Sequence, residues 1–184
     1  VLFRSPYKLV DVPDGKPGVY FEDRLARHVA WDGFDNHDVG EVNALVRAEA
    51  ADPTRGRLEA YRDVPSTVLG NSRDVFVYLP SSYDNASCPS LPVLMVHDGN
   101  ESITRSPFHL AADDHFAAKP SDSSVLVFVA LHAQAERIDD YTFATKTGRA
   151  DAYGNALRDE ILPWAAATHR LCSAPRDRGL TGAS

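Results

Sequence analysis

Two short runs of consecutive apolar residues, 93–96 and 125–131, constrain the fold of this 184-residue chain most. Each run has the length of a strand. A run that is apolar on both sides of a strand predicts burial on both faces of a sheet, which is typical of parallel strands. Between the runs, Ser106 and Pro107 predict the start of a helix that continues to Ala118. A strand, a helix and a strand in this order predict a right-handed crossover in a parallel sheet.

The segments on either side extend this pattern. Strand-like runs at 58–63 and 74–79 precede the two central runs, and β-branched and aromatic residues dominate the second of them. A long helix is predicted at 151–171, with a kink at Pro163 because proline removes one backbone hydrogen bond. A short strand candidate at 178–181 follows it. The order predicts an α/β fold with a mostly parallel sheet flanked by helices.

The N-terminal part of the chain is rich in Asp, Gly and Pro, and residues 6–56 are predicted to be a segment that leads into the main domain. One helix is predicted within it, opened by a capping box of Asp38 and Glu41 and ended at Pro53. Residues 1–5 are expected to be an artefact that does not belong to the fold.

Charge and hydropathy exclude two classes of partner. The net charge is -7 and Lys and Arg form no basic stripe, whereas nucleic-acid binding needs clustered positive charge. The longest apolar run, 125–131, is far shorter than the roughly 20 residues of a membrane-spanning helix. The sequence therefore predicts neither a nucleic-acid partner nor membrane insertion. It leaves open the oligomeric state and a cytoplasmic or periplasmic location.

Side chains of metal-ligating types are present but poorly arranged. Cys88 and Cys172 lie far apart and show no C-x-x-C spacing, so two free thiols and a single disulfide both stay open. In the helix after Pro107, one His and one Asp share a face while a second His points elsewhere, which favours a solvated helix surface. The four polar residues of this helix are His109, Asp113, Asp114 and His115. No metal or other cofactor is predicted.

Five local motifs follow one another in a particular order. They are Val77-Tyr78-Leu79-Pro80, Met95-Val96-His97-Asp98-Gly99-Asn100, Arg137-Ile138-Asp139-Asp140-Tyr141-Thr142, Glu160-Ile161-Leu162-Pro163 and Gly182-Ala183-Ser184. With these motifs the chain resembles the esterase branch of the α/β hydrolases, which includes esterase D and the enterochelin (siderophore) esterases. The third motif departs from the family pattern, because Asp140 stands where Glu is usual. The resemblance implies that residues 57–184 are the N-terminal half of an α/β-hydrolase domain.

The resemblance also implies roles for individual residues. Ser184 would be the nucleophile, on the sharp strand-to-helix turn that begins at Gly182. Taken alone, this serine is only the last residue of the sequence, and the upstream motifs are what favour the nucleophile. The loop after the 93–96 run would supply one N–H of an oxyanion hole, with Gly99, Asn100 and Glu101 as candidates.

Two further polar residues, Arg137 and Asp140, leave two alternatives open. They would either order a loop near the site or contact the acyl group of a substrate, or they would form a solvated surface pair of little consequence.

The implied function is that of a serine carboxylic-ester hydrolase that works through an acyl-serine intermediate on a small-molecule ester. A siderophore ester, a feruloyl or acetyl sugar ester and a small thiol ester all remain open. In this family the acidic residue and the histidine of the triad follow the serine, so the 184 residues by themselves are expected to be inactive. The resemblance also implies that the C-terminal strands of the sheet are missing. A central strand would then become an edge with apolar surface exposed, so poor solubility or self-association is expected. The alternative is a non-catalytic binding or interaction module on the same scaffold.

Overall fold

The computed structural model describes residues 54–84, 90–133, 136–143 and 146–182, and three backbone strands nearer the N-terminus. These strands form an antiparallel sheet of order β1-β2-β3 that the sequence did not predict. They are β1 (Tyr7–Asp11), β2 (Pro17–Phe21) and β3 (Leu25–Ala30). The helix predicted after Asp38 lies outside the described residues, as do residues 1–5 and Cys88.

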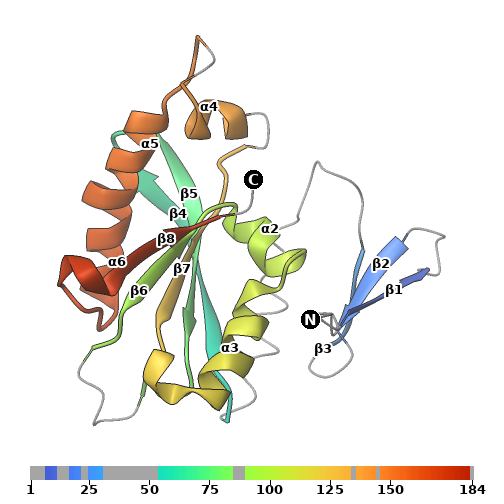
Figure 1. Ribbon diagram of the computed structural model, residues 1–184. Helices are drawn as coiled ribbons and strands as arrows, with labels where there is room; N and C mark the ends of the chain where they lie inside the picture. Colours follow the sequence, from blue (N-terminus) through green and yellow to red (C-terminus); the bar gives the residue numbers. More distant parts are fainter. Residues whose placement is uncertain are drawn as a thin grey trace.

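The main sheet has five strands in the order β4-β5-β7-β6-β8 (Figure 1). The strands are β4 (Arg57–Ser66), β5 (Asn71–Leu79), β6 (Val93–Val96), β7 (Val125–Val129) and β8 (Arg178–Thr181). Strand β6 is parallel to both β7 and β8, whereas β5 is antiparallel to both β4 and β7. The predicted α/β class is confirmed. The parallel character is confined to the half of the sheet that contains β7, β6 and β8.

Helices cover both faces of this sheet (Figure 1). Helices α2 (Gly99–Thr104) and α3 (Phe108–Ala118) cover one face. The other face is covered by α5 (Ala150–Ala156), a π-helical turn (Leu157–Ile161) and α6 (Leu162–Thr168). The short helix α4 (Arg137–Tyr141) follows β7. The smaller 3-10 turns are Pro120–Asp122 and Pro175–Asp177.

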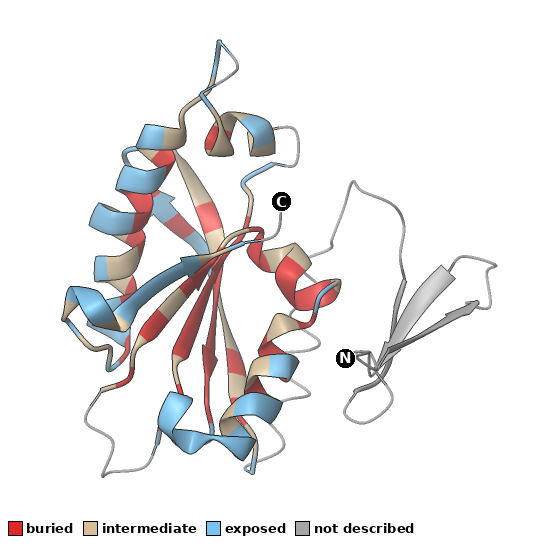
Figure 2. Cartoon of the chain, in the orientation of Figure 1, coloured by how far each residue is buried: buried red, intermediate tan, exposed pale blue. Residues whose placement is uncertain are grey.

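Alternate residues of the central strands pack into two separate hydrophobic cores. All five residues of β7 are buried, as predicted for a strand covered on both faces (Figure 2). Val127 packs into the core under α5 and α6, and its neighbour Phe128 packs into the core under α2 and α3. This arrangement follows from the period of two along a strand, because successive side chains point to opposite faces of the sheet.

The long helix predicted at 151–171 is interrupted as expected near Pro163. The π-helical turn Leu157–Ile161 comes directly before Leu162 and Pro163. Proline has no N–H to donate, and a π-turn is one of the ways in which a helix accommodates the missing bond. The structure thus shows a local change of helix type directly before Pro163, and the predicted kink stays a prediction.

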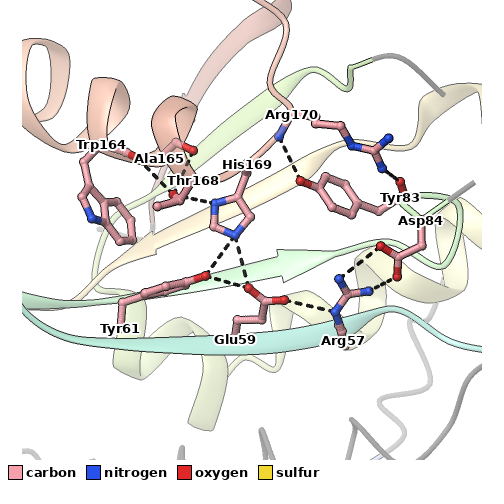
Figure 3. A network of polar contacts seen from close by, with 10 residues as sticks. All are labelled: Arg57, Glu59, Tyr61, Tyr83, Asp84, Trp164, Ala165, Thr168, His169 and Arg170. Atoms are coloured by element: carbon pink, nitrogen blue, oxygen red, sulfur yellow. Dashed lines mark hydrogen bonds and ion pairs between the residues drawn. The ribbon is translucent and has the colours of Figure 1, made fainter. Parts of the chain in front are cut away.

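A polar network fixes the end of α6 to the edge strand β4 (Figure 3). His169 follows α6, and its Nε2 lies 3.2 Å from Glu59 Oε2 and 3.2 Å from the Tyr61 hydroxyl. Its Nδ1 lies 2.9 Å from the hydroxyl of Thr168. The hydrogen bond with His169 is the main reason why the pKa of Glu59 falls to about 2. The Glu59 carboxylate therefore stabilises the fold when it is charged.

The predicted solvated surface of α3 is wrong for two of its four residues. His109 is fully buried, and Asp113 is only 4% exposed. Asp113 Oδ1 accepts hydrogen bonds from the Gly56 N–H at 2.9 Å and from the Tyr78 hydroxyl at 2.7 Å. Both residues face the sheet, because Asp113 binds Tyr78 of β5 and the ring of His109 lies 6.4 Å from that of Phe128 in β7.

The other two polar residues of α3 do lie at the surface. Asp114 accepts a hydrogen bond from Arg55 at 2.9 Å, and His115 pairs with Asp122 at 2.9 Å. Within the described residues, no three His, Cys, Asp or Glu side chains are grouped as a metal site would require.

Candidate active site

The ends of β6 and β8 lie side by side, and this contact places the predicted motifs next to each other. Val96 pairs with Thr181, and the N–H of His97 donates to the Thr181 carbonyl at 2.9 Å. A Cβ on Gly182 would lie 2.9 Å from the Cβ of His97, so glycine permits this close approach. The candidate nucleophile Ser184 lies outside the described residues, and Gly182 is the last residue described before it.

The three predicted oxyanion-hole residues are the first three residues of α2. The first intrahelical hydrogen bond runs from the Ser102 N–H to the Asp98 carbonyl at 2.8 Å. Helix geometry leaves the N–H groups that come before it, those of Gly99, Asn100 and Glu101, without an acceptor inside the helix. The sequence predicts a loop for this segment, whereas the structure shows the helix α2.

Gly99 is needed for steric reasons. A Cβ at this position would lie 2.7 Å from both the carbonyl carbon of Phe128 and the nitrogen of Val129. These are backbone atoms of β7, which cannot move aside as a side chain can. The first turn of α2 therefore rests directly on the central strand, beside the point where β8 ends.

Arg137 does not form a surface pair with Asp140, so that alternative is wrong. Instead, Arg137 Nε and one terminal nitrogen donate to the two oxygens of Asp98 at 3.0 and 2.8 Å. This bond to Asp98 is the main reason why the pKa of Arg137 is raised. The hydroxyl of Tyr141 donates to Asp98 Oδ1 at 3.0 Å and accepts from the Asp98 N–H at 3.2 Å. Helix α4 thus orders the turn before α2.

Asp140 belongs to a buried ion network. Its carboxylate is fully buried and lies 2.8 Å from a terminal nitrogen of Arg73 and 2.7 Å from Arg149 Nε. The Arg73 side chain is 1% exposed. Arg149 also pairs with Glu136, just before α4. Asp140 therefore connects α4 to β5 and to the start of α5.

A pocket of about 510 Å³ opens between α4, α5 and the end of β8. Both Arg137 and Asp140 line it, together with side chains for which the sequence predicts no site. The other lining residues are His97, Tyr141, Ala150, Tyr153, Gly154, Leu157, Leu180 and Gly182. A helical spacing of four residues relates Tyr153 to Leu157 and signals one shared face, but spacing alone does not distinguish a pocket wall from a core.

Apart from Arg137 and Asp140, which form ion pairs with other side chains, the polar groups of the pocket are neutral aromatic residues. His97 Nδ1 lies 3.0 Å from the Tyr153 hydroxyl. Burial lowers the pKa of His97 and raises the pKa of Tyr153 to about 12. At neutral pH the pocket therefore presents an uncharged imidazole and uncharged phenols, which suits an organic group that carries few charges.

The chain matches the model of one protein family over residues 66–184, and that family is described as "Putative esterase". No curated protein matches the chain. Among the described helices, none combines the length and apolar character of a membrane span.

Several solved structures share the fold. A ferulic acid esterase superposes with a TM-score of 0.53 at 18% identity, over 70% of this chain and 48% of that one. The enterobactin esterase FES from Shigella flexneri gives a TM-score of 0.56 at 14% identity, over 72% of this chain and 31% of that one. The enterobactin and salmochelin hydrolase IroE gives 0.55 at 20% identity, over 73% and 55%. The chain thus spans about a third to a half of these structures.

Proposed function

Because the chain belongs to this family of esterases, we propose that the whole protein is a serine hydrolase of carboxylic esters, with Ser184 as its nucleophile. The observation that carries the proposal is the pairing of β6 with β8. It brings Gly182, two residues before Ser184, against His97 at the start of the turn that leads into α2. In the nucleophile turn of α/β hydrolases the serine hydroxyl is exposed above the end of the sheet.

The proposed chemistry uses the backbone donors of that turn. The Ser184 oxygen attacks the ester carbonyl carbon, and the N–H of Asn100 or Glu101 donates to the carbonyl oxygen as it becomes negative. The alcohol leaves to give an acyl-serine, and water then releases the acid and restores the serine. No cofactor takes part in these steps.

The general base is not assigned to any described residue. His97 is a poor candidate, because its Nδ1 is engaged by the Tyr153 hydroxyl and burial lowers its pKa. By the family order, the base and its acidic partner follow Ser184, and a second oxyanion donor is the N–H of the residue after the serine. We therefore propose that the 184 residues alone do not turn over esters.

The pocket suggests where the organic part of the ester binds. Its volume of about 510 Å³ is within the usual range for small-molecule sites, and Leu157, Leu180 and two tyrosines provide much of its wall. The relatives of known structure are named for ferulic acid and enterobactin. For this protein, a siderophore ester, a feruloyl or acetyl sugar ester and a small thiol ester are the proposed substrate classes.

Hydrolysis of p-nitrophenyl butyrate by the full-length gene product tests the proposal, with Ser184→Ala as the decisive variant. Loss of the nucleophile is expected to lower kcat by at least about a thousandfold. The matched control is Ser121→Ala, because this serine is exposed in the turn after α3 and should leave the rate unchanged. Equal rates for wild type and Ser184→Ala would remove Ser184 from the chemistry. A wild type without any hydrolysis would favour a binding module.

A further inference from the structure

Asp98 has an unusual backbone conformation for the residue before a helix. Its φ of 51° and ψ of 47° lie in the left-handed region, where few residues other than glycine, asparagine and aspartate are found. An aspartate at this position normally has extended backbone angles, and its carboxylate accepts a hydrogen bond from the second or third N–H of the helix. In α2 these two N–H groups belong to Asn100 and Glu101, the proposed oxyanion donors.

The carboxylate of Asp98 is directed away from those donors. Within the described residues it makes no capping bond to α2. Both of its oxygens instead accept hydrogen bonds from α4, from Arg137 at 3.0 and 2.8 Å and from the Tyr141 hydroxyl at 3.0 Å. The Tyr141 oxygen also accepts the Asp98 N–H, so α4 holds both the side chain and the backbone of this residue.

The charge of this arrangement is also balanced. Asp98 is 3% exposed, and an unpaired carboxylate so close to a developing oxyanion would oppose the charge of the transition state. The Arg137 guanidinium compensates this charge with two parallel hydrogen bonds. The ion pairs of the buried Asp140 carboxylate with Arg73 and Arg149 in turn fix α4.

We propose that Arg137 and Tyr141 are positioning residues that hold Asp98 in the left-handed conformation and so keep its carboxylate from capping α2. The N–H groups of Asn100 and Glu101 then remain available to the substrate oxygen. Without the clamp, Asp98 relaxes to the extended conformation, and its carboxylate occupies the donors that the reaction needs. This inference rests on the proposed function, because it explains how the oxyanion donors of that site are kept vacant.

The kinetic test uses the full-length protein with p-nitrophenyl butyrate. Arg137→Gln is expected to lower kcat about tenfold to a hundredfold, within the range for disturbing oxyanion donors, while KM changes less than about threefold. The decisive variant is Arg137→Gln combined with Asp98→Gly, because glycine accepts the left-handed conformation and has no carboxylate to cap the helix. The double variant should regain at least about fivefold in kcat over Arg137→Gln. A double variant no faster than the single one would overturn the clamp.

Controls separate loss of folding from loss of positioning. Arg158→Gln removes an arginine that pairs with Asp159 on an exposed part of the π-helical turn, and it should leave kcat unchanged. If Arg137→Gln fails to fold, Tyr141→Phe takes its place, because it removes a single hydroxyl. It is expected to lower kcat about threefold to tenfold, the effect of one hydrogen bond. An unchanged kcat in folded Tyr141→Phe and Arg137→Gln would refute the inference.

A second readout does not depend on hydrolysis. Amide exchange measured by NMR should become slower at Asn100 and Glu101 in Arg137→Gln, because the released carboxylate accepts these N–H groups. If the wild type proves inactive, the proposed function fails, and these two exchange rates decide the clamp by themselves. Exchange that stays the same or becomes faster would contradict it.

Discussion

The buried carboxylate of Asp140 provides a sharp prediction about stability. Asp140→Ala leaves Arg73, whose side chain is 1% exposed, without its charged partner at 2.8 Å. Removing one partner of a buried ion pair typically costs about 3–5 kcal/mol, because the remaining charge stays buried and uncompensated. Urea unfolding of the full-length protein, followed by circular dichroism, measures this loss of free energy directly.

Two further variants show whether the buried charge is the cause. The double variant Arg73→Met with Asp140→Leu removes both charges and keeps apolar volume, so it should be more stable than Asp140→Ala. Asp159→Ala removes a partner from an exposed pair and should leave the midpoint unchanged. A loss below about 1 kcal/mol in Asp140→Ala, or a double variant no more stable than it, would refute the reasoning.

Three other changes test the packing and the charges. Gly99→Ala places a Cβ 2.7 Å from the backbone of Phe128, so thermal unfolding should show a clear loss of stability. In contrast, a Cβ on Gly154, which lies inside α5, would meet no atom within 4 Å. Gly154→Ala should therefore raise the free energy of unfolding by up to about 1 kcal/mol. Because His169 lowers the pKa of Glu59 from 4.5 to about 2, the charged form stabilises the fold above pH 4.5. That stability should disappear as the pH falls toward 2. In Glu59→Gln the melting temperature should depend less on pH below 4.5.

The central elements could be predicted because each has a strong local signal. The apolar runs at 93–96 and 125–131 correspond to β6 and β7, and the proline at position 163 marks the interruption of the last long helix. Such signals depend on neighbouring residues alone. They do not determine which strands pair, so the antiparallel placement of β4 and β5 had to come from the structure.

Contacts between distant residues explain what could not be predicted from the sequence. Arg137 binds Asp98, 39 residues away in the sequence. This contact shows that Arg137 orders a turn and does not form a surface pair with Asp140. Asp113 is polar on a mostly exposed helix, and only its partners Gly56 and Tyr78 reveal that it is buried. The direction of a helix face depends on what it packs against, which local spacing does not record.

The proposed catalytic residues were identified through the order of motifs. That order relates Ser184 to residues 99–101, and the structure adds the pairing of β6 with β8 that places Gly182 beside His97. The pocket between α4 and α5 had no such signal, because Tyr153 and Leu157 have the same spacing as ordinary core residues.

Covalent labelling tests the central claim most directly. The full-length protein is incubated with a fluorophosphonate, which reacts with activated serine nucleophiles, and the modified residue is located by peptide mass spectrometry. The account predicts a single adduct on Ser184 that Arg137→Gln forms more slowly and Ser184→Ala does not form. No adduct, or an adduct on another serine that persists in Ser184→Ala, would contradict it.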